Sequence, residues 1–253
     1  MTAEEAKNLV EYTLDLGSQM IECGAEAWRA DDMMMRIFRA YDLTVINSHT
    51  MATQTIVSIK TPEGERYTSS CFINPEKTST NLEKMELINS VARYICEERP
   101  NLQDLPILVR SSHTHWSWKI FVGYVLGAGS FAIFFGGNFL DGFIASIIAI
   151  IVYAMECIRS IHKQNKTIYT IIACFVAGLL AHCFVSFSSS SHLDMIIIGD
   201  IMLFIPGLAL VNGVRELFYA DILTGIYRIT EAILGAGAIA LGYSASIVIG
   251  GVL

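Results

Sequence analysis

Charged side chains are scarce in this chain, and the few that it has are unevenly distributed. Only 16% of the 253 residues are charged and 53% are hydrophobic, whereas about 25% of the residues of an average soluble domain are charged. Up to Lys119 the chain contains twelve Lys or Arg and seventeen Asp or Glu, and beyond it five and seven. The composition therefore predicts a soluble first part and a second part that enters a membrane.

Several motifs of catalysis and ligand binding are absent from the sequence. It contains no glycine-rich phosphate loop, no nucleophile elbow and no HExxH motif, which argues against an enzyme and against ATP-driven pumping. The six cysteines form no CxxC pair, and His113 and His115 lack the further ligands of a zinc site. The acidic first part has no basic cluster that would bind nucleic acid. We therefore predict no catalytic residues, metal, cofactor or nucleic-acid partner.

Residues 1–112 are predicted to form a small cytosolic α+β domain. The period of the apolar residues changes from helical to alternating and back, which predicts an ααβββα order. The expected helices cover 3–20, about 25–41 and 81–99, and the strands lie between 43 and 74. The acidic, amphipathic start is unlike a secretory signal. Charged residues of the second helix, Glu26 and Arg29 among them, are expected to pair on its surface.

Residues 113–253 are predicted to form a membrane domain of about five transmembrane helices. Each apolar run is close to the ~17–25 residues that cross a hydrocarbon core, although the first and fourth are short. The expected spans are 119–136, 139–157, 168–187, 195–211 and 229–253. The predicted fold class is therefore an α-helical polytopic membrane protein preceded by a cytosolic α+β domain. Small residues crowd several spans and predict close helix packing.

The cations of the membrane part predict its orientation. Cytosolic loops carry an excess of Lys and Arg, and all five cations beyond Lys119 fall in loops on the side of the first domain. They are Arg159, Lys163, Lys166, Arg215 and Arg228. The N-terminus is thus expected in the cytosol and the C-terminus outside. Five spans also suggest half of an inverted repeat, completed by a separate subunit or by a second copy of the chain.

The stretch from Asp200 to Arg228 contains the groups from which we predict a transport site. Asp200 lies inside an apolar run, where an ionisable residue is functional by default. Pro206 removes a backbone donor, and many transporters bind substrate at such a break in a helix. The predicted substrate- or ion-binding residues are Asp200, Pro206, Gly207, Asn212, Arg215, Glu216, Asp221 and Arg228. The alternative is a kinked helix followed by an ordinary polar loop.

The donors and acceptors in this stretch suit a small anionic or zwitterionic substrate. Arginines and backbone N–H groups can bind a carboxylate, and carboxylates can bind an ammonium group or a proton. Three further residues are secondary candidates. His182 could relay protons or simply bond a neighbouring helix, and Asp141 and Glu231 lie near the ends of spans.

Three stretches make the chain similar to a known family. They are CGAEAWRADDMMMRIFRAY, FGGNFLD and PGLALVNGVRELFYADILTGIYR. With the five-span order they resemble the N-terminal half of the threonine/serine exporter family, which includes split two-protein versions and a related dicarboxylate (succinate) exporter. The family pattern is matched at Pro206, Gly207, Asn212, Gly225 and Arg228. Glu216 and Ala220 stand where Asp and Gly are usual, so the resemblance does not extend to substrate details.

The resemblance implies a subunit of a secondary exporter in the bacterial cytoplasmic (inner) membrane, driven by the proton gradient. A separately encoded membrane subunit would supply the second half. The expected substrate is a small amino acid such as threonine or serine, and a dicarboxylate is the close alternative. A membrane-anchored regulatory or sensory protein without transport activity is the alternative from a different class.

Overall fold

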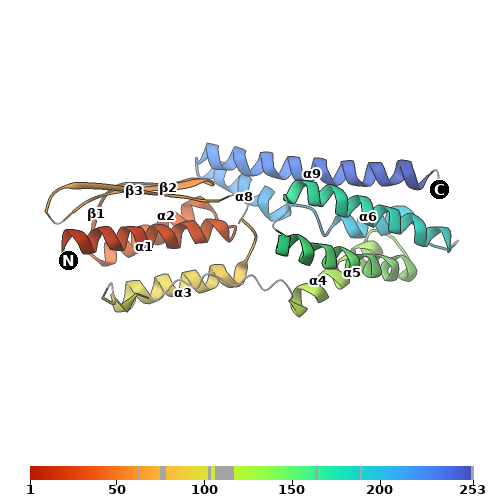
Figure 1. The fold of residues 1–253 in the computed structure, drawn as a ribbon, viewed down its shortest axis with the longest axis horizontal. Coiled ribbons are helices and arrows are strands. Elements are labelled where there is room, and N and C mark those ends of the chain that lie inside the picture. Colours follow the sequence, from red (N-terminus) through yellow and green to blue (C-terminus); the bar gives the residue numbers. More distant parts are fainter. Residues whose placement is uncertain are drawn as a thin grey trace. The chain divides into compact units, whose positions relative to one another are not determined.

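The computed structural model describes residues 1–61, 63–74, 78–101, 104–105, 117–162, 165–188 and 190–251, with the backbone alone for 160–162. The chain forms two compact units, each treated separately here (Figure 1). The N-terminal unit contains Met1–Ser111 and Leu208–Thr230, and the membrane unit contains Ser112–Gly207 and Glu231–Leu253. The expected boundary at 112, together with His113, His115 and Lys163, lies outside the described residues.

The N-terminal unit has the predicted ααβββα order. Its elements are α1 (Ala3–Glu22), α2 (Ala27–Ala40), β1 (Thr44–Thr50), β2 (Gln54–Lys60), β3 (Arg66–Phe72) and α3 (Leu82–Glu98). The strands form an antiparallel sheet in the order β1-β2-β3. Apolar residues at helical spacing on α1, α2 and α3 pack with the inward face of β2, which gives the unit its own core. Two further segments, α8 (Gly207–Phe218) and the start of α9 (Ile222–Gly250), complete this unit.

Asp31 connects α2 to the sheet. Its carboxylate accepts hydrogen bonds from the hydroxyls of Ser48 and Thr50 at 2.9 and 2.8 Å. The carboxylate therefore joins α2 to strand β1.

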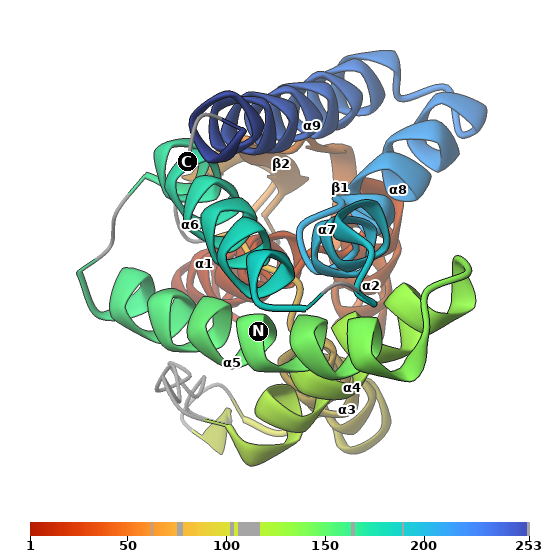
Figure 2. The same cartoon turned by 90° about the vertical axis from the view of Figure 1, so that its right-hand side faces the viewer.

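The membrane unit consists of α4 (Trp118–Phe134), α5 (Phe139–His162), α6 (Lys166–Ser186), α7 (Leu193–Ile201) and most of α9. Figure 2 shows α4 beside α5, with which it packs. Within the described residues, α5, α6 and α9 are long and apolar enough to cross a membrane. The shorter α4 has 17 residues and α7 has nine. The protein is thus a helical membrane protein, and the count of five spans stays a prediction.

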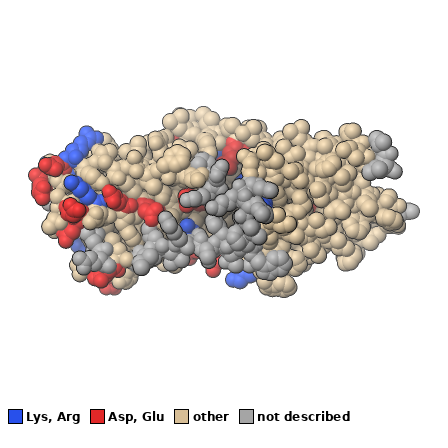
Figure 3. Space-filling view, in the orientation of Figure 1, with Lys and Arg blue, Asp and Glu red and all other residues tan. Residues whose placement is uncertain are grey.

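The surfaces of the two units differ in charge. On the face drawn in Figure 3, acidic and basic side chains gather over the N-terminal unit, whereas the surface of the membrane unit is mostly uncharged. Its exposed residues include many large apolar side chains, such as Phe131, Phe143 and Leu241. Such a surface is expected where lipid, not water, is the solvent.

The break predicted inside the fourth apolar run is confirmed, and one predicted span needs correction. Within 195–211, α7 ends at Ile201 and α8 begins at Gly207. Proline at 206 cannot donate a backbone hydrogen bond and clashes with a preceding helical turn, which accounts for the break. The last helix begins at Ile222 instead of 229. The first turns of α9, up to Thr230, belong to the N-terminal unit.

Small residues let the helices of the membrane unit approach closely, as predicted. A Cβ atom added at Gly199 would lie 2.6 Å from the carbonyl oxygen of Ala128, and one at Gly242 would lie 2.6 Å from that of Ile171. Both distances are shorter than van der Waals contact. Only glycine therefore lets α7 pack against α4 at the first point and α9 pack against α6 at the second.

Candidate functional site

The predicted site residues are divided between the two units. Asn212, Arg215, Glu216, Asp221 and Arg228 belong to the N-terminal unit. Asp200, Pro206, Gly207, Asp141, His182 and Glu231 belong to the membrane unit. The polar groups that the predicted site residues form in each unit are described in turn.

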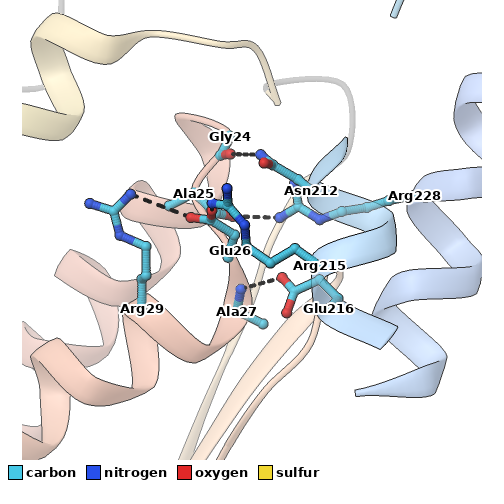
Figure 4. Close-up of polar contacts among 9 residues, drawn as sticks. All are labelled: Gly24, Ala25, Glu26, Ala27, Arg29, Asn212, Arg215, Glu216 and Arg228. Atoms are coloured by element: carbon cyan, nitrogen blue, oxygen red, sulfur yellow. Dashed lines mark hydrogen bonds and ion pairs between the residues drawn. The ribbon is translucent and has the colours of Figure 1, made fainter. Parts of the chain in front are cut away.

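The first cluster joins the loop between α1 and α2 to α8 and α9, and we call it the α8 clamp (Figure 4). Its residues are Gly24, Ala25, Glu26, Ala27, Asn212, Arg215, Glu216 and Arg228. The sequence allows the loop to present its carbonyl groups because Gly24 adopts a φ of 88°, which glycine reaches without steric cost.

The clamp contains four direct connections. The amide of Asn212 donates to the carbonyl of Gly24 at 3.1 Å, and the guanidinium of Arg228 donates to that of Ala25 at 2.5 Å. The guanidinium of Arg215 forms an ion pair with the carboxylate of Glu26. The carboxylate of Glu216 accepts the backbone N–H of Ala27 at 2.6 Å. Glu216 thereby occupies the N-terminus of α2, where free N–H groups and the helix dipole favour an anion.

Glu26 pairs with Arg29 as predicted, but it does not lie on the surface of the domain as expected. Its side chain is 4% exposed and lies between Arg215 and Arg29, the latter at 3.4 Å. Helical spacing places Glu26 and Arg29 together, but it contains no information about a segment 189 residues away. The signal that was present is the family-like stretch CGAEAW, in which Glu26 lies.

Burial acts to raise the pKa of both carboxyl groups of the clamp, but the net pKa shift is downward for Glu26 and upward for Glu216. For Glu26, hydrogen bonds from its own backbone N–H and from Arg215 outweigh burial, and its pKa lies below the ordinary value. For Glu216, the Ala27 N–H and the charge of Arg228 offset only part of the effect of burial, and its pKa is raised. Glu26 is therefore held as a carboxylate at neutral pH, whereas the fold favours a proton on Glu216.

The variant Glu216→Gln is expected to change how stability depends on pH. The unfolded pKa of a glutamate is about 4.3 and the folded pKa of Glu216 is higher, so folding takes up a proton between the two values. Wild-type protein should gain stability relative to the variant as the pH falls through the folded pKa of Glu216. The gain should be complete at about pH 4.3, the unfolded pKa. Thermal unfolding midpoints of both proteins, measured from neutral to acidic pH, test this slope.

The exposed Glu63 provides the control for this experiment. Its replacement by glutamine removes an exposed carboxyl group instead of a buried one, so the curve for Glu216→Gln is compared with the curve for this variant at each pH. A wild-type advantage over Glu216→Gln that grows toward alkaline pH would contradict the prediction.

The turn between α8 and α9 holds two residues of the predicted site stretch in structural roles. The carboxylate of Asp221 accepts the backbone N–H of Thr224 at 3.2 Å and caps α9. Ala220 has a φ of 64°, in the left-handed region that favours glycine. This backbone geometry explains why the related family usually has glycine at the position of Ala220.

Replacement of Ala220 by glycine is expected to stabilise the protein by about 0.5–1 kcal/mol. Glycine relieves the clash of Cβ in the left-handed conformation but loses more freedom on folding, so the net gain is smaller than the strain. Thermal unfolding should show a midpoint raised by about 1–4 °C. Ala209→Gly, inside α8, is the matched control and should lose about 1 kcal/mol. A loss of stability in Ala220→Gly would contradict the prediction.

The second cluster is centred on Asp200 in the membrane unit. Asp200 is fully buried, and neither of its carboxyl oxygens has a hydrogen-bond partner among the described residues. It lies within electrostatic range of Cys174 on α6 and Tyr243 on α9. The hydroxyl of Tyr243 is also buried without a partner in the described part of the chain. An ionisable group and a hydroxyl are thus buried together beside the apolar core of the membrane unit.

Arg215 and Arg228 have partners within the N-terminal unit. Both guanidinium groups bind the loop between α1 and α2. The remaining residues of the break have packing roles: a Cβ on Gly235 would lie 3.6 Å from Cγ of Pro206, and Gly207 begins α8 with an ordinary backbone conformation.

Asp141 has a fully occupied carboxylate. It accepts the backbone N–H groups of Asn138 and His192, both at 2.8 Å, and contacts Nδ1 of His192 at 3.0 Å. Asn138 in turn accepts the N–H of Asp141 and donates to the carbonyl of Ser190. The FGGNFLD stretch therefore connects the α4–α5 turn to the loop before α7, which favours a structural role for Asp141.

The other two secondary candidates lie apart from these contacts. The ring of His182 packs against Gly250, where an added Cβ would lie 2.5 Å from Cγ of the ring. Its Nε2 is buried without a hydrogen-bond partner in the described residues. Glu231 is exposed on α9. Asp200 is the buried candidate carboxyl group of which neither oxygen has a hydrogen-bond partner among the described residues.

Comparison with known proteins places this arrangement in a family. Residues 11–250 match the threonine/serine exporter (ThrE) family. The chain belongs to this family. The protein is therefore a multi-pass membrane protein of an exporter family, and membership favours transport over catalysis.

Two relatives bear the name "Probable succinate transporter subunit YjjP". The protein of Klebsiella aerogenes is 23% identical over 236 residues, which are 88% of this chain and 87% of the relative. The protein of Escherichia coli K12 is 23% identical over 240 residues, which are 90% and 89%. No solved structure matches the chain.

Family membership gives the α8 clamp a further meaning. Two of the three stretches that make the chain similar to the exporter family, those containing Gly24–Ala27 and Asn212–Arg228, meet in the clamp. The third stretch forms the network of Asp141. The family-like residues of this exporter therefore form polar contacts that hold helix ends together.

Proposed function

We propose that this chain is one subunit of a proton-coupled secondary exporter that moves small amino acids, such as threonine or serine, out of the cytoplasm. Membership of the exporter family supports export across a membrane. The observation that carries the coupling is the buried carboxyl group of Asp200, which has no hydrogen-bond partner among the described residues.

A carboxylate in an apolar interior must be neutralised. The desolvation of an unpaired charge is so unfavourable that such a group takes up a proton or binds a cation. Asp200 can therefore be stable in this conformation as the protonated acid. Release of the proton requires contact with water, so a conformational change that wets Asp200 on one side of the membrane would couple proton movement to transport. Tyr243 offers the nearby hydroxyl that could bind the carboxyl group as it ionises.

We also propose that the N-terminus lies in the bacterial cytosol and the C-terminus outside, in the inner membrane. The α8 clamp supports this orientation because residues 212–228 must lie on the same side as the loop at 24–27. The positive-inside rule places that side in the cytosol. In this proposal the chain crosses the membrane five times, and the shortest passes are α4 and the segment from α7 to Pro206. An odd number of passes puts the two termini on opposite sides of the membrane.

A second membrane subunit completes the exporter in this proposal. The relatives are named as transporter subunits, and an odd number of spans suits one half of an inverted pair. Two copies of the chain are the alternative. The same relatives favour a dicarboxylate as the alternative substrate, because their name specifies succinate.

Efflux of labelled threonine and labelled succinate, from cells that express the chain with and without the protein encoded beside it, tests the proposal. Efflux of threonine that needs both proteins and stops when the proton gradient is collapsed is the expected result. Efflux of succinate alone would replace the substrate but retain the exporter. No efflux of either compound would overturn the proposal and favour a membrane-anchored regulatory protein.

A further inference from the structure

The helix α8 has two faces of opposite character. At 100° per residue, Asn212, Arg215 and Glu216 fall on one side of the helix, and they form the α8 clamp. The other side is exposed and apolar. Its residues are Leu210, Val211, Val214, Leu217 and Phe218. The polar groups of α8 are therefore used by contacts within the N-terminal unit, and its outward side has no polar group to offer water.

The first turns of α9 extend this exposed apolar surface. Ile222, Leu223 and Ile226 are exposed, whereas Thr224 and Arg228 on the opposite side of the helix are buried. We call the exposed residues of α8 and these three the outer face. So large an apolar surface is unusual on a soluble domain and marks a site of interaction.

The outer face is continuous with the exposed side of a membrane helix. Along α9, the exposed apolar residues after Ile226 include Ile233, Leu234, Leu241 and Val248. At 100° per residue they fall on the same side as Ile222, Leu223 and Ile226. One uninterrupted stripe thus runs along the helix, and its later part belongs to a segment of spanning length and hydropathy.

The length of α9 indicates where the stripe leaves the hydrocarbon core. Its 29 residues extend over about 43 Å at a rise of ~1.5 Å per residue, whereas the core of a bilayer is about 30 Å thick. About nine residues therefore lie beyond the core. This number agrees with the part of α9, Ile222–Thr230, that belongs to the N-terminal unit.

We propose that the outer face lies in the lipid bilayer, at the level of the head groups and the upper acyl chains. Helices of this kind lie in the plane of the interface with the apolar side in lipid and the polar side in water. In this chain the polar side is bound by the loop at 24–27 instead of water. Tyr219, which stacks on Trp28 with ring centroids 4.8 Å apart, supplies an aromatic ring of the type enriched at this level.

This placement gives the α8 clamp a consequence beyond transport. The soluble α+β domain is attached to a helix that is itself held by lipid, so the domain is tied to the membrane surface at a second point besides the chain leading into α4. Neither contact depends on the substrate or on proton coupling, and the inference can hold even if the proposed function fails.

Photocross-linking at Phe218 tests the inference in the full chain. Phe218 is 86% exposed, and Phe72 on β3 is a matched control that is 72% exposed. Each is replaced by p-benzoylphenylalanine, and membranes of expressing cells are irradiated and the chain is analysed by mass spectrometry. The expected result is a lipid adduct at position 218, at least several-fold more abundant than at position 72, with no change in the thermal unfolding midpoint.

The other outcomes overturn the inference. A cross-link from position 218 to a second protein would show that a partner subunit or another copy covers the outer face. No lipid adduct at position 218, or a yield no higher than that at position 72, would show that the outer face does not lie in lipid. Position 210, in place of Leu210, repeats the test on the same face if the variant at 218 does not accumulate.

Discussion

The variant Asp200→Asn is expected to reduce gradient-driven efflux to the background of cells that lack the protein. Asparagine has nearly the same shape but cannot bind and release a proton in the accessible pH range, so a step that needs both forms of the carboxyl group stops. The fold should persist, because no hydrogen bond to the Asp200 carboxyl group is lost among the described residues. The free energy of unfolding of the variant, obtained from thermal unfolding, should therefore agree with that of wild type to within about 1 kcal/mol.

The control for this prediction is Asp194→Asn. Asp194 lies on the same helix, six residues before Asp200, but it is exposed. Its replacement should leave efflux and its dependence on the proton gradient unchanged. If Asp200→Asn retains gradient-driven efflux while both variants insert into the membrane, Asp200 is not the coupling residue and a different carrier of the proton must be sought.

Loss of the ion pair between Glu26 and Arg215 is expected to weaken the attachment of α8. Arg215→Ala leaves the buried carboxylate of Glu26 with the weaker ion pair to Arg29, at 3.4 Å, as its remaining one among the described residues. Breaking a fully buried pair costs about 3–5 kcal/mol, and the half-exposed Arg215 side chain reduces this to about 1–3 kcal/mol. Thermal unfolding of the purified protein should show a midpoint lowered by several degrees.

Two comparisons make this measurement specific for the clamp. The exchange Glu26→Arg with Arg215→Glu restores opposite charges and should recover part of the loss. Arg93→Ala removes an exposed ion pair with Glu86 and should cost less than about 1 kcal/mol. If Arg215→Ala costs no more than Arg93→Ala, the pair with Glu26 is a surface contact without influence on the attachment of α8.

Most of the secondary structure follows from local sequence. The ααβββα order, the helix break at Pro206 and the spanning helices α5, α6 and α9 all depend on periods and residue types within short windows. The errors occur where a neighbour in space decides the outcome. The last span was expected to begin at 229, but α9 begins at Ile222, and the guanidinium of Arg228 inside it donates to the carbonyl of Ala25.

The site shows the same division. An ionisable residue in an apolar run marks Asp200 without any structure, because lipid penalises a charge at every such position. The sequence could not separate Asp200 from Arg215 and Glu216, since all three lie within one polar stretch. The structure assigns them to different units, and it shows that Asp141 and Asp221 satisfy backbone N–H groups.

By itself, the sequence determined that this is a helical membrane protein with an α+β part ahead of its apolar helices, and that it resembles an exporter family. Hydrophobicity, period and motif are properties of neighbouring residues, so no tertiary contact is needed to read them. The tertiary structure alone decided that Glu26 and Arg215, 189 residues apart, form a pair, and that Asp200 is buried without a partner among the described residues. Pairing and burial depend on which distant segments meet, and a linear pattern does not contain that information.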